Sequence, residues 1–416
     1  MTFFDHLAAD FAPPFRLCAE DTVQRLLQQD TSSNRPGILL GKVQSGKTRL
    51  FLSVIGLAFD KGYDVAVILT KGTKSLARQT LKRVHEQFHT FRLIDAVQFF
   101  DIMFLPTNLT PFELGQKLIL VVQKEDDNLR RLISAVQDQY PQLQKKKFLF
   151  IDDEADTASL SFRKVQGQVN VGVISSQIDT VKDLVTDSDY LQVTATPYSL
   201  YLQPDEDVHR NGSLLFSPRR PAFTVILPIH ADYIGGDHYF EKSSDPQSPA
   251  YYFYEPVPIA ERDSLKAEDR RRLKIENVLQ EKNSAVLVRA VVNFIVGGTM
   301  RRMQQRANGD ALQKYGFLFH TEFSRASHDW QERLASAINA DLVSAAQHDT
   351  PVFDTLLKQS FEDLKRSLEI AGTTVFAYTE VRQEIKRALA DGHMMITKVN
   401  SESDVEALLD DDGQLR

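Results

Sequence analysis

The sequence predicts an α/β fold in which a parallel β-sheet carries a phosphate-binding P-loop. Three observations predict it: short apolar runs alternate with helical segments from residue 37 to about 200, a glycine-rich loop follows the first run, and acidic or hydroxyl residues follow two later runs. Strands of a parallel sheet are buried on both faces and therefore continuously apolar, and crossover helices separate them in the sequence. A doubly wound α/β domain is thus expected.

The predicted elements of the first half follow in order along the chain. Residues 1–34 are predicted to form an N-terminal helical segment, because TVQRLLQQ is amphipathic and the polar stretch DTSSNRPG then breaks the pattern. Residues 35–200 are predicted to form the first α/β domain, with strands in GILLG, YDVAVILT, LILVV, KKFLFID and YLQVTATP.

The second half is predicted to contain a connector and another domain. Residues 201–283 are rich in proline and tyrosine and are predicted to be an irregular insertion or connector. Strand candidates in YGFLFH, TTVFAY and HMMITKVNS predict a second α/β domain over residues 284–416. Few α/β units are present there, so this domain is expected to be small or incomplete.

Composition sets the broad class of the protein. The 416 residues are 42% hydrophobic and 25% charged, which suits two or three packed domains. The single cysteine, Cys18, excludes an intramolecular disulfide and points to a reducing compartment. No apolar run approaches the roughly 20 residues that span a bilayer. A cytoplasmic protein without a membrane partner is therefore expected. The net charge of −7 requires any nucleic-acid-binding surface to be a local one.

A P-loop is the strongest motif in the sequence. GKVQSGKT, residues 41–48, fits G-x-x-x-x-G-K-[ST] between a strand and a helix. Glycines let the backbone wrap around phosphate oxygens, and the helix N-terminus adds N–H groups and a positive dipole end. Lys47 is predicted to contact the β and γ phosphates of ATP, and Thr48 to bind Mg²⁺. The side chain of Gln44 faces either the γ-phosphate or solvent. The predicted nucleotide-binding residues are Gly41, Gln44, Ser45, Gly46, Lys47 and Thr48.

A metal site is predicted where the apolar run KKFLFID meets a group of carboxylates. Acidic residues at the end of a buried strand are costly unless they serve a metal. Asp153 is predicted to bind Mg²⁺, and Glu154 to orient and deprotonate the attacking water. Asp152 is the alternative metal ligand, because the doublet leaves the register ambiguous by one residue. The competing interpretation is a solvated turn.

A third motif ends the last predicted strand of the first domain. The P-loop, then Asp-Glu-Ala-Asp at residues 153–156, then Thr-Ala-Thr-Pro at residues 194–197 resembles motifs I, II and III of superfamily-two helicases and translocases. The resemblance implies a RecA-like P-loop domain over residues 35–200 and a second, incomplete RecA-like domain over residues 284–416. It gives Thr194 and Thr196 a role in coupling nucleotide state to movement.

One further segment resembles the nucleic-acid-facing motif Ia of the same proteins. In LTKGTKSLARQTLKRV, residues 69–84, the resemblance assigns phosphate-backbone contacts to Lys71, Thr73, Lys74 and Arg78. An ordinary amphipathic helix with solvated cations is the competing interpretation, because phosphate contacts leave no sharp sequence signature.

The sequence is most similar to one branch, the bacterial Z-one domain family, whose members are described as endonucleases. The matching stretches are GKVQSGKT, IDDEAD, TATP and the Y-I-G-G-D-x-x-F pattern of residues 233–240. HTEFSRAS, residues 320–327, is similar to the family's motif-IV region but contains an extra pair, Glu322-Phe323. The resemblance implies a prokaryotic restriction or anti-phage defence system with companion proteins. No nuclease pattern is visible in the residues.

The predicted function is therefore a nucleic-acid-dependent ATPase of the helicase or translocase type, with DNA favoured over RNA as its partner. The alternative is a nucleotide-gated switch or scaffold that assembles partner proteins. A small-molecule kinase would not explain the second and third motifs. No R-G or Q-x-x-R-x-x-R element follows residue 331 to supply an arginine finger, which leads us to expect a truncated second domain.

Overall fold

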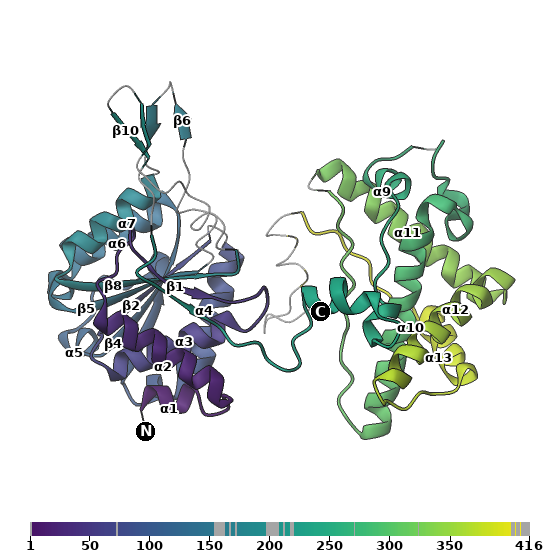
Figure 1. The fold of residues 1–416 in the computed structure, drawn as a ribbon, viewed down its shortest axis with the longest axis horizontal. Helices are drawn as coiled ribbons and strands as arrows, with labels where there is room; N and C mark the ends of the chain where they lie inside the picture. The colour runs from purple at the N-terminus through teal and green to yellow at the C-terminus, as the bar shows by residue number, and fades with distance from the viewer. Residues whose placement is uncertain are drawn as a thin grey trace. The chain divides into compact units, whose positions relative to one another are not determined.

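The computed structural model contains two compact units, Met1–Tyr233 and Ile234–Arg416 (Figure 1). It describes residues 2–71, 74–153, 163–165, 168–170, 173–196, 208–210, 213–216, 220–269, 271–322 and 324–400, together with Asp404 and Leu408. The first unit contains the parallel sheet and the second is helical, and each is described by itself.

The first unit is built on a seven-stranded parallel sheet, which confirms the predicted α/β class. Its spatial order is β11-β1-β8-β5-β2-β4-β3. The strands are β1 (Gly37–Leu40), β2 (Val65–Thr70), β3 (Val97–Asp101), β4 (Lys117–Gln123), β5 (Lys147–Asp153), β8 (Asp187–Thr194) and β11 (Phe223–Ile226). Because all the strands are parallel, their carboxyl ends lie along one edge, where α/β proteins place their ligands.

Helices cover both faces of this sheet (Figure 1). One face packs against the N-terminal helices α1 (Phe3–Leu7) and α2 (Pro13–Gln28), together with α3 (Lys47–Asp60) and α4 (Lys74–Leu93). The other face packs against α6 (Asp126–Ser134) and α7 (Val173–Leu184). Helices α1 and α2 lie within residues 1–34, and all five strands predicted from the sequence are present.

Two strands of the sheet were not predicted, and one changes the predicted organisation. β3 alternates buried and half-buried residues at a sheet edge, so its apolar signal is weak. β11 lies within the segment predicted to be an insertion, but it pairs in parallel with β1. The sheet thus extends beyond residue 200, and the two units divide after Tyr233. Two antiparallel hairpins complete this unit, β6–β7 (Arg163–Val165, Gln168–Asn170) and β9–β10 (Val208–Arg210, Ser213–Phe216).

The second unit is helical, which corrects the prediction of a second RecA-like domain over residues 284–416. Between residues 284 and 400 the described chain forms α10 (Ala285–Asn308), α11 (Arg325–Gln347), α12 (Pro351–Ile370) and α13 (Tyr378–Ala390), and contains no strand. The three predicted strands, near residues 315–320, 373–378 and 393–401, are irregular wherever they are described, apart from Tyr378, which begins α13. Leu318 is 87% exposed in the first of them. A strand needs a paired neighbour, and the described parts of these runs pair with no other strand, although Phe319, Val375 and Phe376 pack against the helical core.

Helix α10 is the central element of this helical core. The stretch Lys282–Asn308 is long and apolar enough to cross a membrane by length and composition alone. Val288, Val292, Ile295 and Val296 are buried in one cluster with residues of α11, α12 and α13. These four side chains are covered by protein, as expected of a core helix in a packed bundle, and 44% of the apolar stretch is buried in total.

The single cysteine provides a test of the packing between α2 and the sheet. Cys18 is buried, and its burial, helped by Asp21, raises the pKa of the thiol to about 11. Only the thiolate is nucleophilic. We therefore expect the native protein to react with a disulfide reagent at pH 8 far more slowly than the urea-unfolded chain. Rapid labelling in the absence of denaturant would contradict the packing of α2.

Candidate nucleotide and metal site

The P-loop joins the end of β1 to the start of α3, as predicted. Gln44 and Gly46 take positive φ values of 57° and 88°, so the loop turns through two left-handed residues. A Cβ atom on Gly41 would lie 2.8 Å from the Lys47 Cγ atom and 2.9 Å from the Ser45 hydroxyl. Glycine is therefore required at position 41 for the loop to close, and glycine is the favoured residue at position 46.

The polar side chains of the loop are held by its own backbone. The Lys47 ammonium donates to the carbonyl oxygen of Lys42 at 2.9 Å, and the Ser45 hydroxyl donates to the same oxygen at 2.7 Å. Lys47 and Thr48 occupy the first turn of α3, where N–H groups have no helical acceptor. A helix N-terminus with a lysine folded over it is suited to binding a polyphosphate.

The alternation of side chains along β5 places Asp152 and Asp153 on opposite faces of the sheet. Leu149 and Ile151 belong to the core under α3, whereas Phe148 and Phe150 belong to the core under α6 and α7. Successive strand residues point to opposite faces. The Asp153 side chain is therefore on the α3 face that carries the P-loop, and Asp152 is on the other face. The geometry favours Asp153 as the metal ligand.

Strand β8 brings the third motif beside the P-loop, because it lies between β1 and β5. The Gly41 N–H donates to the Thr194 carbonyl oxygen at 3.1 Å. The Thr196 N–H donates to the Thr194 hydroxyl at 3.0 Å. The start of the P-loop and the end of β8 are thus connected directly, which is the arrangement that a coupling role for these threonines requires.

The predicted nucleic-acid residues are only partly described. Lys71 directly follows β2 at the carboxyl edge of the sheet, and Arg78 is in α4; both side chains are exposed. Thr73 and Glu154 lie outside the described residues, as does the side chain of Lys74. Their assignments stay predictions.

Three residues at this edge were not found in the sequence analysis as site residues. The Arg83 guanidinium, in α4, donates to the Thr48 hydroxyl at 3.0 Å. The Tyr233 hydroxyl donates to the Val43 carbonyl oxygen at 2.7 Å, at the tip of the P-loop. The Thr70 hydroxyl, at the end of β2, is buried and has no hydrogen-bond partner in the described part of the chain. Tyr233 begins the Y-I-G-G pattern, and Thr70 and Arg83 lie in the stretch of residues 69–84 that resembles motif Ia, although that resemblance assigned neither of them a contact.

The residues at this edge fit a magnesium ion that is shared with phosphates. The Thr48 hydroxyl and the Asp153 carboxylate are hard oxygen donors, and Mg²⁺ is commonly held by one or two such groups plus substrate phosphates and water. The described residues contain no cluster of three or more histidine, cysteine or acidic side chains that would hold a metal unaided. A metal is thus expected to bind there together with a nucleotide.

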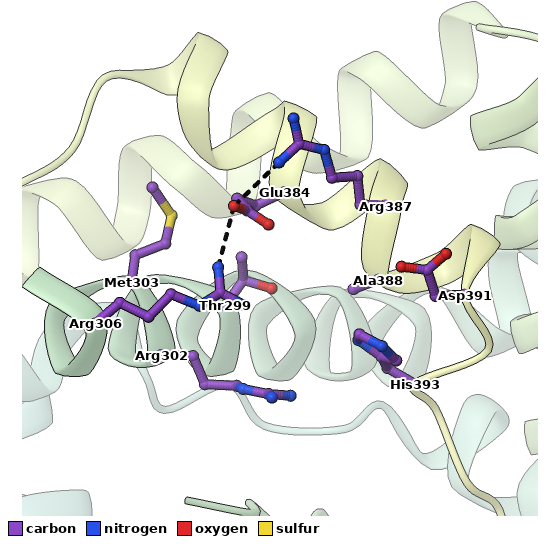
Figure 2. A pocket seen from close by; sticks show the side chains of 9 residues that line it. All are labelled: Thr299, Arg302, Met303, Arg306, Glu384, Arg387, Ala388, Asp391 and His393. Carbon is purple, nitrogen blue, oxygen red and sulfur yellow. Dashed lines mark hydrogen bonds and ion pairs between the residues drawn. The ribbon is translucent and has the colours of Figure 1, made fainter. Parts of the chain in front are cut away.

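A separate cavity of about 230 Å³ lies in the helical unit between α10 and α13 (Figure 2). Glu384 lies between Arg306 and Arg387, at distances of 3.1 and 3.4 Å. Both arginines are in the last turn of their helices, where a cation compensates the negative end of the helix dipole. These arginines are therefore explained by helix electrostatics, and the cavity contains none of the predicted site residues.

Comparison with known proteins adds little to this description. No protein-family model matches the chain, and no curated protein is significantly similar to it. Among solved structures the chain is similar to the Aeropyrum pernix ORC2 protein in its ADPNP and ADP complexes, with 14% sequence identity and a TM-score of 0.28. The alignment covers 91% of this chain and 85% of that chain. Such a likeness is too weak to assign a family or an activity.

The class of the protein is therefore defined by its own sheet and loop. A parallel sheet, a P-loop leading into α3, and an acidic strand end two strands away define a P-loop α/β protein. Membership of the superfamily-two or Z-one families is not supported by any family match and stays a proposal.

Proposed function

We propose that the protein is a Mg²⁺-dependent ATPase of the P-loop class whose activity depends on nucleic acid. The proposal is supported by two placements: the P-loop with Lys47 and Thr48 follows the carboxyl end of β1, and Asp153 ends β5 on the face that strand alternation assigns to α3. A single-phosphate site would need neither an acidic strand end nor a hydroxyl at the second residue of α3.

Each residue of the proposed site has a separate role in ATP hydrolysis. The backbone N–H groups at the start of α3 and the Lys47 ammonium bind the β and γ phosphates. Thr48 and Asp153 hold Mg²⁺, which neutralises charge on the phosphate oxygens when it is bound. Glu154 orients the attacking water and accepts its proton, as its place after Asp153 in the sequence predicts.

The nucleic-acid partner is proposed from Lys71 and Arg78. Lys71 is an exposed cation on the connection between β2 and α4, and Arg78 is an exposed cation within α4. The same helix contains Arg83, which contacts Thr48 of the P-loop. Phosphate contacts are sequence-independent and suit a backbone-tracking motor. The proposal also includes DNA as the partner, a role in prokaryotic restriction or anti-phage defence, and companion proteins, all through the resemblance of the motifs. It includes a cytoplasmic setting because the single cysteine points to a reducing compartment.

A nucleotide-gated switch is the second candidate, favoured by Tyr233. This residue contacts the tip of the P-loop and is the last residue of the first unit. A change in the loop on ATP binding would therefore act directly on the chain that enters the helical unit. In this case ATP binding would control assembly with partner proteins, and nucleic acid would have no effect on turnover.

The experiment that separates the candidates is ATP hydrolysis measured alone and with single-stranded DNA, duplex DNA or RNA. Stimulation by one of them, reduced in Arg78→Ala, is the expected result. Arg92→Ala is the matched control, because it removes an arginine from the opposite end of the same helix. Turnover that no nucleic acid changes, but that a partner protein raises, would favour the switch.

Arg83 leads to a separate prediction about the metal. Its guanidinium donates a hydrogen bond to the Thr48 hydroxyl, the oxygen that would coordinate Mg²⁺. We expect Arg83→Ala to lower the Mg²⁺ concentration needed for half-maximal nucleotide binding roughly two- to fivefold, the scale of one exposed charged contact. A titration of Mg²⁺ at fixed ATP measures this, with Lys82→Ala as the neighbouring control. An increase in the Mg²⁺ requirement would mean that Arg83 supports the site.

A further inference from the structure

A buried lysine lies directly beneath the proposed metal ligand. Lys124 follows the last residue of β4, and its ammonium donates to the Asp152 carboxylate at 2.8 Å and to the Asp153 carbonyl oxygen at 2.9 Å. The side chains of Lys124 and Asp152 are 1% and 0% exposed. The same ammonium therefore contacts two consecutive residues of β5, the second of which faces the P-loop.

Lys124 reaches β5 across an intervening strand. β2 lies between β4 and β5 in the sheet, and the Lys124 N–H donates to the Thr70 carbonyl oxygen at its end, at 2.9 Å. One residue thus connects the carboxyl ends of β4, β2 and β5. The end of β2 leads directly to Lys71, one of the proposed nucleic-acid contacts.

A tyrosine completes the arrangement from the opposite side. The Tyr190 hydroxyl, on β8, donates to the second carboxylate oxygen of Asp152 at 2.8 Å. Gln192, also on β8, lies directly opposite Asp152 in the strand pairing. Neither the nitrogen nor the oxygen of its side-chain amide has a hydrogen-bond partner in the described structure. Lys124 and Tyr190 are thus the side chains that hold Asp152.

Stability alone is a weak reason for such a pair. Desolvation of two charges offsets most of their attraction, and a buried ion pair is often replaced by apolar residues without loss of stability. Groups that hold a metal ligand in place, by contrast, typically change metal affinity tenfold to a hundredfold when they are removed. The contact with the Asp153 backbone is what a positioning role requires.

We propose that Lys124 is a positioning residue for Asp153, which fixes the end of β5 so that the Asp153 carboxylate faces the P-loop. Its ion pair with Asp152 also holds the Asp152 carboxylate away from the metal site. The inference rests on the proposed function, because it requires Mg²⁺ to bind between Asp153 and the nucleotide.

The test is the Mg²⁺ dependence of binding a fluorescent ATP analogue, which needs no turnover. The informative variant is Lys124→Met with Asp152→Leu, which removes both charges and leaves an apolar pair. We expect it to unfold at a lower temperature than the wild type, because the buried Tyr190 hydroxyl loses the carboxylate that accepts its hydrogen bond. While folded, it should bind the analogue without metal as the wild type does. The Mg²⁺ concentration for half-maximal tightening should rise roughly tenfold.

The matched control is Lys117→Met with Asp64→Leu. Lys117 begins the same strand, β4, and pairs with Asp64 at 3.1 Å near the opposite edge of the sheet. This control should leave the Mg²⁺ dependence unchanged. A wild-type Mg²⁺ dependence in the Lys124→Met, Asp152→Leu protein would overturn the proposal, since the pair would then be structural only.

Two further outcomes are distinguishable from these. If the double variant does not fold, Lys124→Arg is measured instead, because it keeps the charge but not the reach of the ammonium to both oxygens. An increased Mg²⁺ requirement in that variant supports the proposal, and a wild-type requirement overturns it. Wild-type protein that binds no nucleotide through Lys47 would contradict the proposed function itself, before any Lys124 variant is made.

Discussion

Lys47→Ala is expected to reduce ATP turnover by roughly two to three orders of magnitude. The Lys47 ammonium, at the start of α3, is a charged donor of the P-loop and is folded onto the loop backbone. Removing a preorganised donor from a site of developing charge costs about that much in kcat. Steady-state phosphate release, with and without nucleic acid, measures the loss.

Lys61→Ala is the matched control for this result. Lys61 is the C-cap residue of the same helix and is exposed, so its removal leaves the phosphate site unchanged. Unaltered nucleic-acid-dependent turnover in Lys47→Ala would exclude the P-loop as the hydrolytic site and with it the proposed function. A parallel loss in both variants would point to damage of α3 rather than of phosphate binding.

Asp189→Ala is expected to have the largest effect on stability, roughly 3–5 kcal/mol in the free energy of unfolding. Asp189, on β8, is buried and accepts hydrogen bonds from the Tyr63 hydroxyl at 2.5 Å and the Thr31 hydroxyl at 2.7 Å. Alanine would leave both hydroxyls buried without this acceptor. Urea unfolding at pH 7 measures the change.

Asp187→Ala is the control for that measurement. It lies two residues earlier on the same strand, is exposed, and pairs with Lys147 at 3.1 Å. Because exposed ion pairs contribute little, its loss should cost less than about 1 kcal/mol. An equal loss in the free energy of unfolding in the two variants would show that the buried hydrogen bonds of Asp189 add nothing to stability.

The pH dependence of this stability follows from the same residue. Burial raises the pKa of Asp189 above its ordinary value, against the opposing hydrogen bonds from Tyr63 and Thr31. Between the unfolded and the folded pKa the native state binds more protons, so stability falls as pH rises through that window. We expect this fall to be absent in Asp189→Asn, as urea unfolding across acidic pH can measure. A fall that persists unchanged in the variant would assign it to another group.

The parallel sheet could be predicted where burial makes the apolar signal continuous. β2, β4 and β5 are such runs, and each was found. β11 was missed because its four residues follow a proline-rich stretch, so the local pattern indicates irregular chain. In the helical unit the runs predicted as strands are apolar but unpaired, and pairing is a property of the whole fold rather than of a segment.

Some residues of the candidate site could be predicted from the sequence, and others could not. Lys47, Thr48 and Asp153 belong to linear motifs whose spacing reflects the loop and strand that carry them. Three other contacts join residues that are far apart in the sequence. Arg83 is 35 residues from Thr48, Tyr233 is 190 residues from Val43, and Lys124 is 28 residues from Asp152. Only the three-dimensional fold brings such contacts together, and only strand alternation separates Asp152 from Asp153.

The position of β1 has a consequence for how the protein is made. This strand, residues 37–40, is near the start of the chain, but its two neighbours are β8 and β11, which end at Thr194 and Ile226. During synthesis β1 therefore has no partner until most of the first unit has left the ribosome. Such non-local pairing slows folding and leaves an apolar edge exposed meanwhile. The P-loop, which follows β1, is thus among the last parts of this unit to acquire its structure.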